Sequence, residues 1–131
     1  ARFDYWKVAW RAALDRPLPG SGPGTFYAIY RHAKPPEAEM ARLAHNDYLQ
    51  QASDSGIVGL LAFGGFIAAS LAKLHARARG EWLQLATWLG LLGWALQGLV
   101  EFGLYIPALA WPAFFLVGWL WAAAAPRAVT A

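Results

Sequence analysis

The chain of 131 residues is rich in apolar side chains and poor in charged ones. Apolar residues make up 58% and charged residues 15% of it, whereas a soluble domain averages about 45–50% and about 25%. The net charge of +3 is too small to indicate a nucleic-acid partner, and the lack of cysteine excludes disulfides and thiol chemistry. This composition favours a membrane protein.

The charged residues are concentrated in the first part of the chain. Residues 1–54 carry thirteen of the nineteen, whereas residues 82–131 carry two, Glu101 and Arg127. No basic segment followed by an apolar core and a cleavage site opens the sequence, which predicts no signal peptide. Because the sequence begins with alanine in a polar segment, we expect it to be a piece of a longer membrane protein.

Residues 3–15 are predicted to form an amphipathic helix. Apolar side chains recur there at helical spacing, at Phe3, Trp6, Ala9, Trp10 and Ala13. We expect this helix either to lie on the membrane surface or to pack on a helical bundle.

A glycine-rich stretch, GSGPGTF, follows at residues 20–26. It has neither the spacing of a P-loop nor that of a dinucleotide-binding fingerprint. Two interpretations of Gly20, Gly22 and Gly24 are open. They form a tight turn that needs positive φ angles, or they shape a concavity of backbone N–H groups that faces an anion.

The segment that leads to the first apolar run is predicted to be irregular at first and helical afterwards. Residues 27–41 are polar, and Pro35 and Pro36 forbid a helix through that point. We expect a helix to begin again near residues 37–43 and to continue into the apolar run.

His45 lies near this predicted helix start, with Asn46 and Asp47 available as capping residues. A helix N-terminus and partial burial both favour a neutral imidazole, which can accept a proton as a general base. The alternative is an ordinary surface histidine. No second histidine lies three or four positions away, so we expect no metal site.

Three uncharged runs are long enough to cross about 30 Å of hydrocarbon, which takes roughly 17–25 helical residues. They are residues 55–72, 82–100 and 107–125, with a connecting turn at 73–81. Pro107 suits a first helical turn. The predicted fold is an all-α integral membrane protein, in which three transmembrane helices follow a loop, residues 1–54, with short amphipathic helices. The alternative is a buried helical hairpin of a soluble protein.

The basic residues predict the orientation of these helices. Residues 73–80 contain Lys73, Arg77 and Arg79 and no acid, which places this connection in the cytoplasm by the positive-inside rule. Residues 1–54 then lie outside, in the periplasm, and Arg127 ends inside. Glycines in the apolar runs predict close packing against further helices.

Two other kinds of charged residue are candidates for a site in the outer part. Glu101 either marks the end of the second run or faces the same outer cavity as His45. Arginines such as Arg2 and Arg42 suit phosphate oxygens, although solvation or contact with lipid headgroups also accounts for them.

Several of these features together resemble one family. An arginine, Arg2, precedes a Trp-containing helix, and P-x-x-G-x-G-P-G-T-F follows. His45-Asn46 is then separated by nine residues from Gly56 and by two more from Gly59, and VEFGLYIP carries Glu101 where aspartate is common in the family. This order resembles the C-terminal part of the O-antigen ligase and O-antigen polymerase family of bacterial membrane glycosyltransferases.

The resemblance implies a fragment of a bundle of about twelve transmembrane helices in the bacterial inner membrane. It implies an enzyme of lipopolysaccharide biosynthesis, which transfers a glycan from undecaprenyl diphosphate to an acceptor sugar on lipid A-core without a metal or other cofactor. His45 would activate the acceptor hydroxyl, and Arg2 would bind the donor diphosphate. The possible supporting residues are Asn46, Asp47, Arg42, Glu101, Gly20, Gly22 and Gly24.

The resemblance also implies that the fragment is inactive alone, because a second diphosphate-binding arginine lies upstream in the family. It does not separate a ligase from an O-antigen or exopolysaccharide polymerase, or from an enzyme that transfers glycans to protein. A non-catalytic membrane protein, in which His45 only stands beside a helix cap, is the alternative from a different class.

Overall fold

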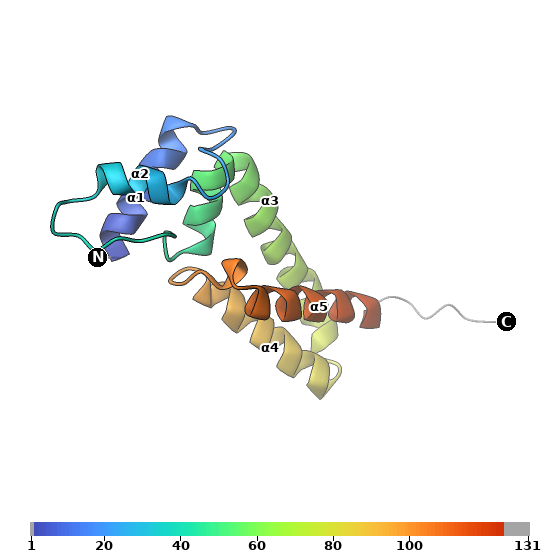
Figure 1. Cartoon of the computed structure of the whole chain (residues 1–131). Helices are drawn as coiled ribbons and strands as arrows, with labels where there is room; N and C mark the ends of the chain where they lie inside the picture. Colours follow the sequence, from blue (N-terminus) through green and yellow to red (C-terminus); the bar gives the residue numbers. More distant parts are fainter. Residues whose placement is uncertain (1, 125–131) are drawn as a thin grey trace.

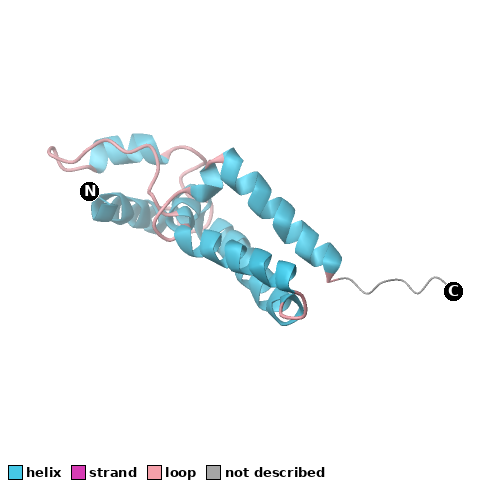
Figure 2. Cartoon of the chain, turned by 90° about the horizontal axis from the view of Figure 1, so that it is seen from below, coloured by secondary structure: helices cyan, strands magenta, loops and turns pink. Residues whose placement is uncertain are grey.

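The structure is a computed structural model that describes residues 2–124, and this part of the chain consists of helices and loops without a strand (Figures 1 and 2). The all-α prediction is therefore confirmed. The elements are α1 (Arg2–Asp15), α2 (Phe26–Ala33), α3 (Asp47–Ala78), α4 (Trp82–Gln97), the 3-10 turn η1 (Gly103–Tyr105) and α5 (Pro107–Ala123). Figure 1 shows α1 and α2 gathered at the N-terminal end of α3, with α4 and α5 along the rest of it.

The amphipathic helix is confirmed as α1, and only part of its periodic apolar face, including Ala9, packs on the rest of the chain. The buried side chains are Tyr5, Val8, Ala9 and Ala12. Phe3 and Trp10, which belong to the periodic apolar face, are exposed.

The prediction that residues 27–41 are irregular is wrong for α2. Phe26 and Tyr30 lie one helical turn apart, are fully buried and stack with their ring centroids 5.6 Å apart. Tyr5 of α1 contacts Tyr30 edge-on at 5.2 Å. Because this aromatic packing comes from α1, a short helix forms where the local sequence carries little helical signal.

The prediction of a helix over residues 37–43 is also wrong. Residues 34–46 form turns and extended backbone, and α3 begins only at Asp47. Asn46 explains this start, because its side chain accepts a hydrogen bond from the backbone N–H of Leu49 as an N-cap residue does.

A kink at Gly56 divides α3 into a polar and an apolar part. Gly56 has φ 66° and ψ −163°, which no helix contains. The 22 residues 57–78 after the kink are about 33 Å long at 1.5 Å per residue, enough to cross a bilayer. Within the described residues, α3 is the one helix both long and apolar enough for this.

The boundaries of the predicted first span and of its turn differ from those of α3. The span was expected at 55–72 and the turn at 73–81, but residues 73–78 continue the helix, and the turn is confined to 79–81. Residues 47–54 are helical, in agreement with the expectation that a helix before the apolar run continues into it.

The chain returns along α4 and runs out again along α5. Glu81 caps α4 by accepting from the N–H groups of Leu83 and Gln84, and Pro107 is the first residue of α5, as predicted. The two helices have 16 and 17 residues, about 24–26 Å, so that a crossing by all three helices stays a prediction. The predicted end of the last span at 125 and Arg127 lie outside the described residues.

Two apolar clusters hold these elements together. One joins α1, α2 and the segment before α3, through Tyr5, Val8, Ala9, Phe26, Tyr30, Ala41 and Ala44. The other joins α3, α4 and α5, through Leu74, Leu91, Ala113, Val117 and Leu120. The polar start of α3 lies between these clusters in the sequence and carries the candidate site.

Candidate active site at the polar end of α3

The start of α3 is fastened to the segment that follows α4. The amide of Asn46 donates from Nδ2 to the carbonyl oxygen of Leu99 at 2.7 Å. The backbone N–H of Asp47 donates to the carbonyl oxygen of Gly98 at 2.7 Å. These bonds occupy the carbonyl groups of Gly98 and Leu99, and α4 ends at Gln97 rather than at the predicted residue 100.

Asp47 is the first residue of α3 rather than its cap, and its carboxylate points toward η1. Oδ2 accepts from the backbone N–H of Leu104 at 3.0 Å. Burial raises the pKa of Asp47 to about 6, against the opposing effect of hydrogen bonds from the backbone of Leu104 and Gly103. The residue stands nine positions before the kink at Gly56 and therefore outside the apolar part of α3.

His45 is held from two sides by aromatic residues. Its ring lies 5.6 Å from that of Tyr5 in α1 and 4.6 Å, edge-on, from that of Phe102 after α4. The indole of Trp6 donates from Nε1 to the carbonyl oxygen of His45 at 3.3 Å. The backbone has φ 52°, a left-handed conformation that is uncommon for a residue with a side chain.

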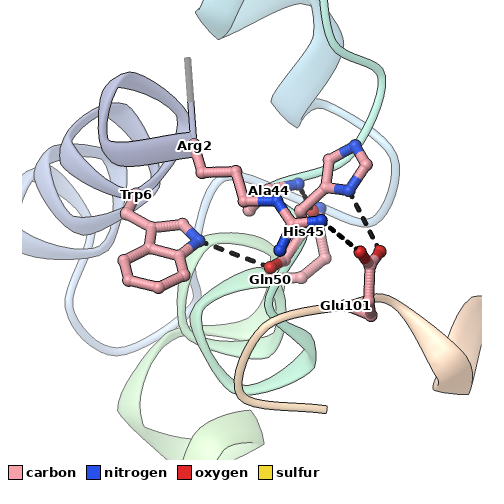
Figure 3. A network of polar contacts seen from close by, with 6 residues as sticks. All are labelled: Arg2, Trp6, Ala44, His45, Gln50 and Glu101. Carbon is pink, nitrogen blue, oxygen red and sulfur yellow. Dashed lines mark hydrogen bonds and ion pairs between the residues drawn. The ribbon is translucent and has the colours of Figure 1, made fainter. Parts of the chain in front are cut away.

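Glu101 joins His45 and Arg2 (Figure 3). Its Oε2 lies 3.2 Å from Nδ1 of His45, and its Oε1 accepts from the Arg2 guanidinium at 2.5 Å. About a third of the His45 and Glu101 side chains and half of the Arg2 side chain are exposed. Of the two interpretations of Glu101, the structure supports the one that places it beside His45.

This arrangement has a definite chemical capacity. A carboxylate that accepts from Nδ1–H of a histidine leaves Nε2 of the same ring as a proton acceptor. A guanidinium has five N–H groups, so that Arg2 can bind an anion while one group remains on Glu101. The cluster therefore combines a proton acceptor with a cation on one partly exposed surface.

The glycine-rich stretch uses its backbone N–H groups within the protein. Ser21 and Gly22 donate to the carbonyl oxygens of Ser53 and Asp54 at 2.8 and 2.9 Å, and Gly24 donates to the Asp54 carboxylate at 3.5 Å. Gly20, Gly22 and Gly24 all have positive φ angles. The structure supports the turn interpretation, because these donors bind α3 rather than face an open concavity.

Gly56 and Gly59 serve close approach of the backbone. A Cβ on Gly56 would collide with the carbonyl oxygens of Pro17 and Leu18, and one on Gly59 would collide with the side chain of Ser55. The N–H of Ile57 donates to Pro17 at 2.7 Å across the kink. Gly56 thus lets the α1–α2 loop lie directly against α3, whereas Gly59 leaves room for Ser55 of α3 itself.

A polar network beneath the cluster was not predicted. Gln50 accepts from the N–H of Ala44 at 2.8 Å and donates to Asp54 at 3.0 Å. Tyr105 donates to Asp54 at 3.3 Å and accepts from Gln51 at 2.9 Å. Burial is the main cause that raises the pKa of both Asp54 and Tyr105. The i, i+4 spacing of Asn46, Gln50 and Asp54 was the sequence signal for this polar face.

Arg42 is the predicted site residue that the structure leaves apart. It is exposed on the segment before α3, and in residues 2–124 no hydrogen bond joins it to His45, Glu101 or Arg2. Across the same described residues, no group of three His, Asp or Glu side chains could hold a metal ion.

The described residues form an all-helical structure with a His–Glu–Arg cluster at the polar end of its one helix long and apolar enough to cross a membrane. Residues 1–64 match the family model Wzy_C, described as O-antigen ligase, so that this part of the chain is similar to the O-antigen ligase family. The resemblance seen in the motifs is thereby confirmed. Comparison with curated proteins and with solved structures gave no match.

Proposed function

We propose that the chain is part of an O-antigen ligase-like glycosyltransferase of the bacterial inner membrane. It transfers a glycan from undecaprenyl diphosphate to a sugar hydroxyl of an acceptor glycolipid, lipid A-core, at the periplasmic face. The family match supports the class of reaction. The observation that carries the proposal is that Glu101 binds both Nδ1 of His45 and the guanidinium of Arg2.

The three residues divide the chemistry among them. Nε2 of His45 takes the proton of the acceptor hydroxyl as its oxygen forms a bond to the anomeric carbon of the donor glycan. The bond from this carbon to the diphosphate oxygen breaks, and undecaprenyl diphosphate leaves with the electron pair. Arg2 stabilises the charge on the diphosphate, and Glu101 orients His45 and balances the imidazolium.

The chemistry of the leaving group decides whether the reaction needs an acid or a metal ion. Diphosphate leaves readily, so that no general acid and no metal ion are required. Direct displacement at the anomeric carbon inverts its configuration. The second diphosphate-binding arginine belongs to an upstream part of the same protein, and the 131 residues alone are inactive.

The position of the site suits a donor whose lipid tail stays in the bilayer. His45 stands eleven positions before the kink at Gly56, and the apolar part of α3 follows the kink. In this proposal residues 1–54 are periplasmic, the turn at 79–81 is cytoplasmic, and α4 and α5 also cross the membrane within a bundle of about twelve helices.

Complementation with the complete gene tests the proposal. The gene should restore glycan transfer to a strain that lacks O-antigen ligase. Restoration only in a strain that lacks the polymerase would assign the chain to the other branch of the family, and restoration in neither would contradict transfer to lipid A-core.

Two variants of His45 test its role as the base. His45→Ala and His45→Asn should lower transfer to a small residual rate while the protein still inserts into the membrane. Asparagine tolerates a left-handed backbone, so that His45→Asn removes the base without adding strain. His32→Asn, at an exposed position of α2, is the matched control and should retain full activity. Substantial transfer by His45→Asn would exclude the base assignment.

A further inference from the structure

The outer side of α1 carries an apolar stripe. Phe3, Trp10 and Leu14 are 72%, 53% and 59% exposed, whereas the opposite side of the helix is buried against the rest of the chain. Their spacing, i, i+7 and i+11, places the three side chains on one face. The stripe includes Phe3 and Trp10 of the periodic apolar face, and the described residues leave more than half of each of its three side chains uncovered.

The stripe is continuous with the apolar surface of α3. A groove of about 260 Å³ is lined by Trp10, Leu14 and Pro17 on one side and by Ile57 and Leu60 on the other. Ile57 is the first residue after the kink, where the membrane-length part of α3 begins. The outward apolar surface therefore runs from α1 directly into the helix that enters the hydrocarbon.

Exposed basic residues flank the stripe. Lys7 and Arg11 lie one helical turn from Phe3 and from Leu14 and are exposed. Tryptophan beside lysine and arginine is the composition of a helix that lies in the interface of a bilayer, because long basic side chains reach the headgroups while apolar rings enter the acyl chains.

We propose that α1 lies in the interfacial region of the outer leaflet, with Phe3, Trp10 and Leu14 inserted among the acyl chains. Phospholipid also fills the groove between Trp10 and Ile57. Lipid is the occupant because the groove opens at the point where α3 enters the bilayer, and the two apolar surfaces form one face. The choice of the outer leaflet rests on the proposed periplasmic position of residues 1–54, whereas the insertion of the stripe does not depend on the transfer reaction.

Nitroxide labels test the placement. The 131 residues contain no cysteine, so that Trp10→Cys and Leu14→Cys each introduce a single thiol into this part of the protein. Arg11→Cys, on the polar side of the same helix, is the matched control. The complete gene product, freed of any other cysteines, is labelled and placed in vesicles of phosphatidylethanolamine and phosphatidylglycerol.

Collision of each label with oxygen and with a water-soluble nickel chelate is then measured. Oxygen concentrates in acyl chains and the chelate in water, so that the ratio of the two rates should be at least about threefold higher at positions 10 and 14 than at position 11. If Trp10→Cys or Leu14→Cys fails to insert into the membrane, Phe3→Cys is used in its place.

Two results would overturn the proposal. A ratio at positions 10 and 14 equal to that at position 11 would place the stripe in water. Low collision rates with both reagents would show that another protein segment covers it. Neither result depends on glycan transfer, so that a failure of this proposal is distinguishable from a failure of the His45 assignment.

Discussion

Glu101 Oε2 lies 3.2 Å from Nδ1 of His45, although the two residues are 56 positions apart in the sequence. The contact exists because the chain runs out along α3 and returns along α4, and because Asn46 and Asp47 then bind the carbonyl groups at the end of α4. Local sequence could equally assign Glu101 to the end of a helix, but the structure makes it the hydrogen-bond partner of His45, the candidate base.

Replacement of Glu101 by glutamine should slow transfer. The glutamine oxygen can still accept from Nδ1–H, but it provides no charge to balance the imidazolium or to hold Arg2. We expect Glu101→Gln to reduce kcat by roughly 10- to 100-fold, measured with a lipid-linked donor in the complete enzyme.

The double variant shows whether Glu101 acts through His45. If it does, His45→Asn/Glu101→Gln should be no slower than His45→Asn, because residues that work as a unit give non-additive losses. Losses that multiply in the double variant would contradict a positioning role. Glu101→Asp, which keeps the charge on a shorter side chain, should retain more activity than Glu101→Gln.

Arg2 is expected to act on the donor rather than on the acceptor. Arg2→Ala should raise the apparent KM for the undecaprenyl diphosphate donor more than that for the acceptor, because a guanidinium binds phosphate oxygens with several N–H groups. Arg2→Lys should restore only part of the donor affinity. An unchanged KM for the donor in Arg2→Ala would count against this assignment.

Gly56 and Gly20 should be intolerant of a side chain. Both have positive φ, and a Cβ on either would collide with backbone, at 2.5 Å from the Asp54 carbonyl oxygen in the case of Gly20. We expect Gly56→Ala and Gly20→Ala each to destabilise the fold by more than about 1 kcal/mol and to lower Tm, followed through tryptophan fluorescence.

Gly65→Ala in the same helix is the control for these variants. A Cβ at Gly65 meets open space, and alanine has the higher helix propensity, so that Tm should be unchanged or higher. Equal losses in Gly65→Ala and Gly56→Ala would mean that helix packing in general, rather than the kink, is responsible.

Asn46 has two separable roles. Its Oδ1 caps α3, and its Nδ2 holds the Leu99 carbonyl beside the turn that carries Glu101. Asn46→Asp keeps the cap but loses the donor, so that we expect near-native helix content with reduced transfer. Asn46→Ala should lose both, at a cost of about 1–2 kcal/mol in stability. Circular dichroism and a transfer assay separate the two effects, and full activity in Asn46→Asp would contradict the second role.

The raised pKa of Asp47 predicts a pH-dependent stability. The folded protein holds the Asp47 proton more tightly than the unfolded chain does, since the pKa rises from 3.8 to about 6. The stabilising free energy that protonated Asp47 contributes is therefore fully present below pH 3.8, and it is lost as the pH rises through about 6. At neutral pH the buried carboxylate opposes folding by about 3 kcal/mol at most.

The variant Asp47→Asn tests the direction of this pH dependence of stability. The amide oxygen can still accept from Leu104, so that the variant should have a higher Tm than the native protein at about pH 7.5, with the difference shrinking toward about pH 5. A lower Tm by the same amount at both values would show that hydrogen bonding, rather than burial of the charge, dominates at this position.

Much of the helical fold follows from local sequence. The spacing in residues 3–15 and the uncharged runs predicted α1, α3, α4 and α5, because apolar periodicity and the absence of charge are local properties. The short helix α2 was missed, since Tyr30 is stabilised by a ring of α1 that lies 25 positions earlier. The start of α3 was placed too early, because the cap at Asn46 outweighs the weaker helical signal of residues 37–43.

The site was predictable in its residues but not in its contacts. His45 and its neighbouring cap are adjacent in the sequence, and their chemistry suggested a base at a helix start. The bridge through Glu101 and the hydrogen bond between Tyr105 and Asp54 depend on how the returning helix meets α3, which no spacing within one segment specifies. The glycines were found as a motif, yet their role as contacts between the α1–α2 loop and the kink needed coordinates.

The interval from Asn46 to Gly56 acts as a spacer of fixed length. At one end the Asn46 side chain binds the turn after α4, and at the other end Gly56 lies against Pro17 and Leu18. Ten helical residues separate these attachment points by about 15 Å, and one inserted residue would rotate them by about 100° relative to each other. The nine residues between Asn46 and Gly56 therefore set the distance and the angle between the start of α3, next to His45, and the kink, so that this motif encodes a length and an angle as well as a set of side chains.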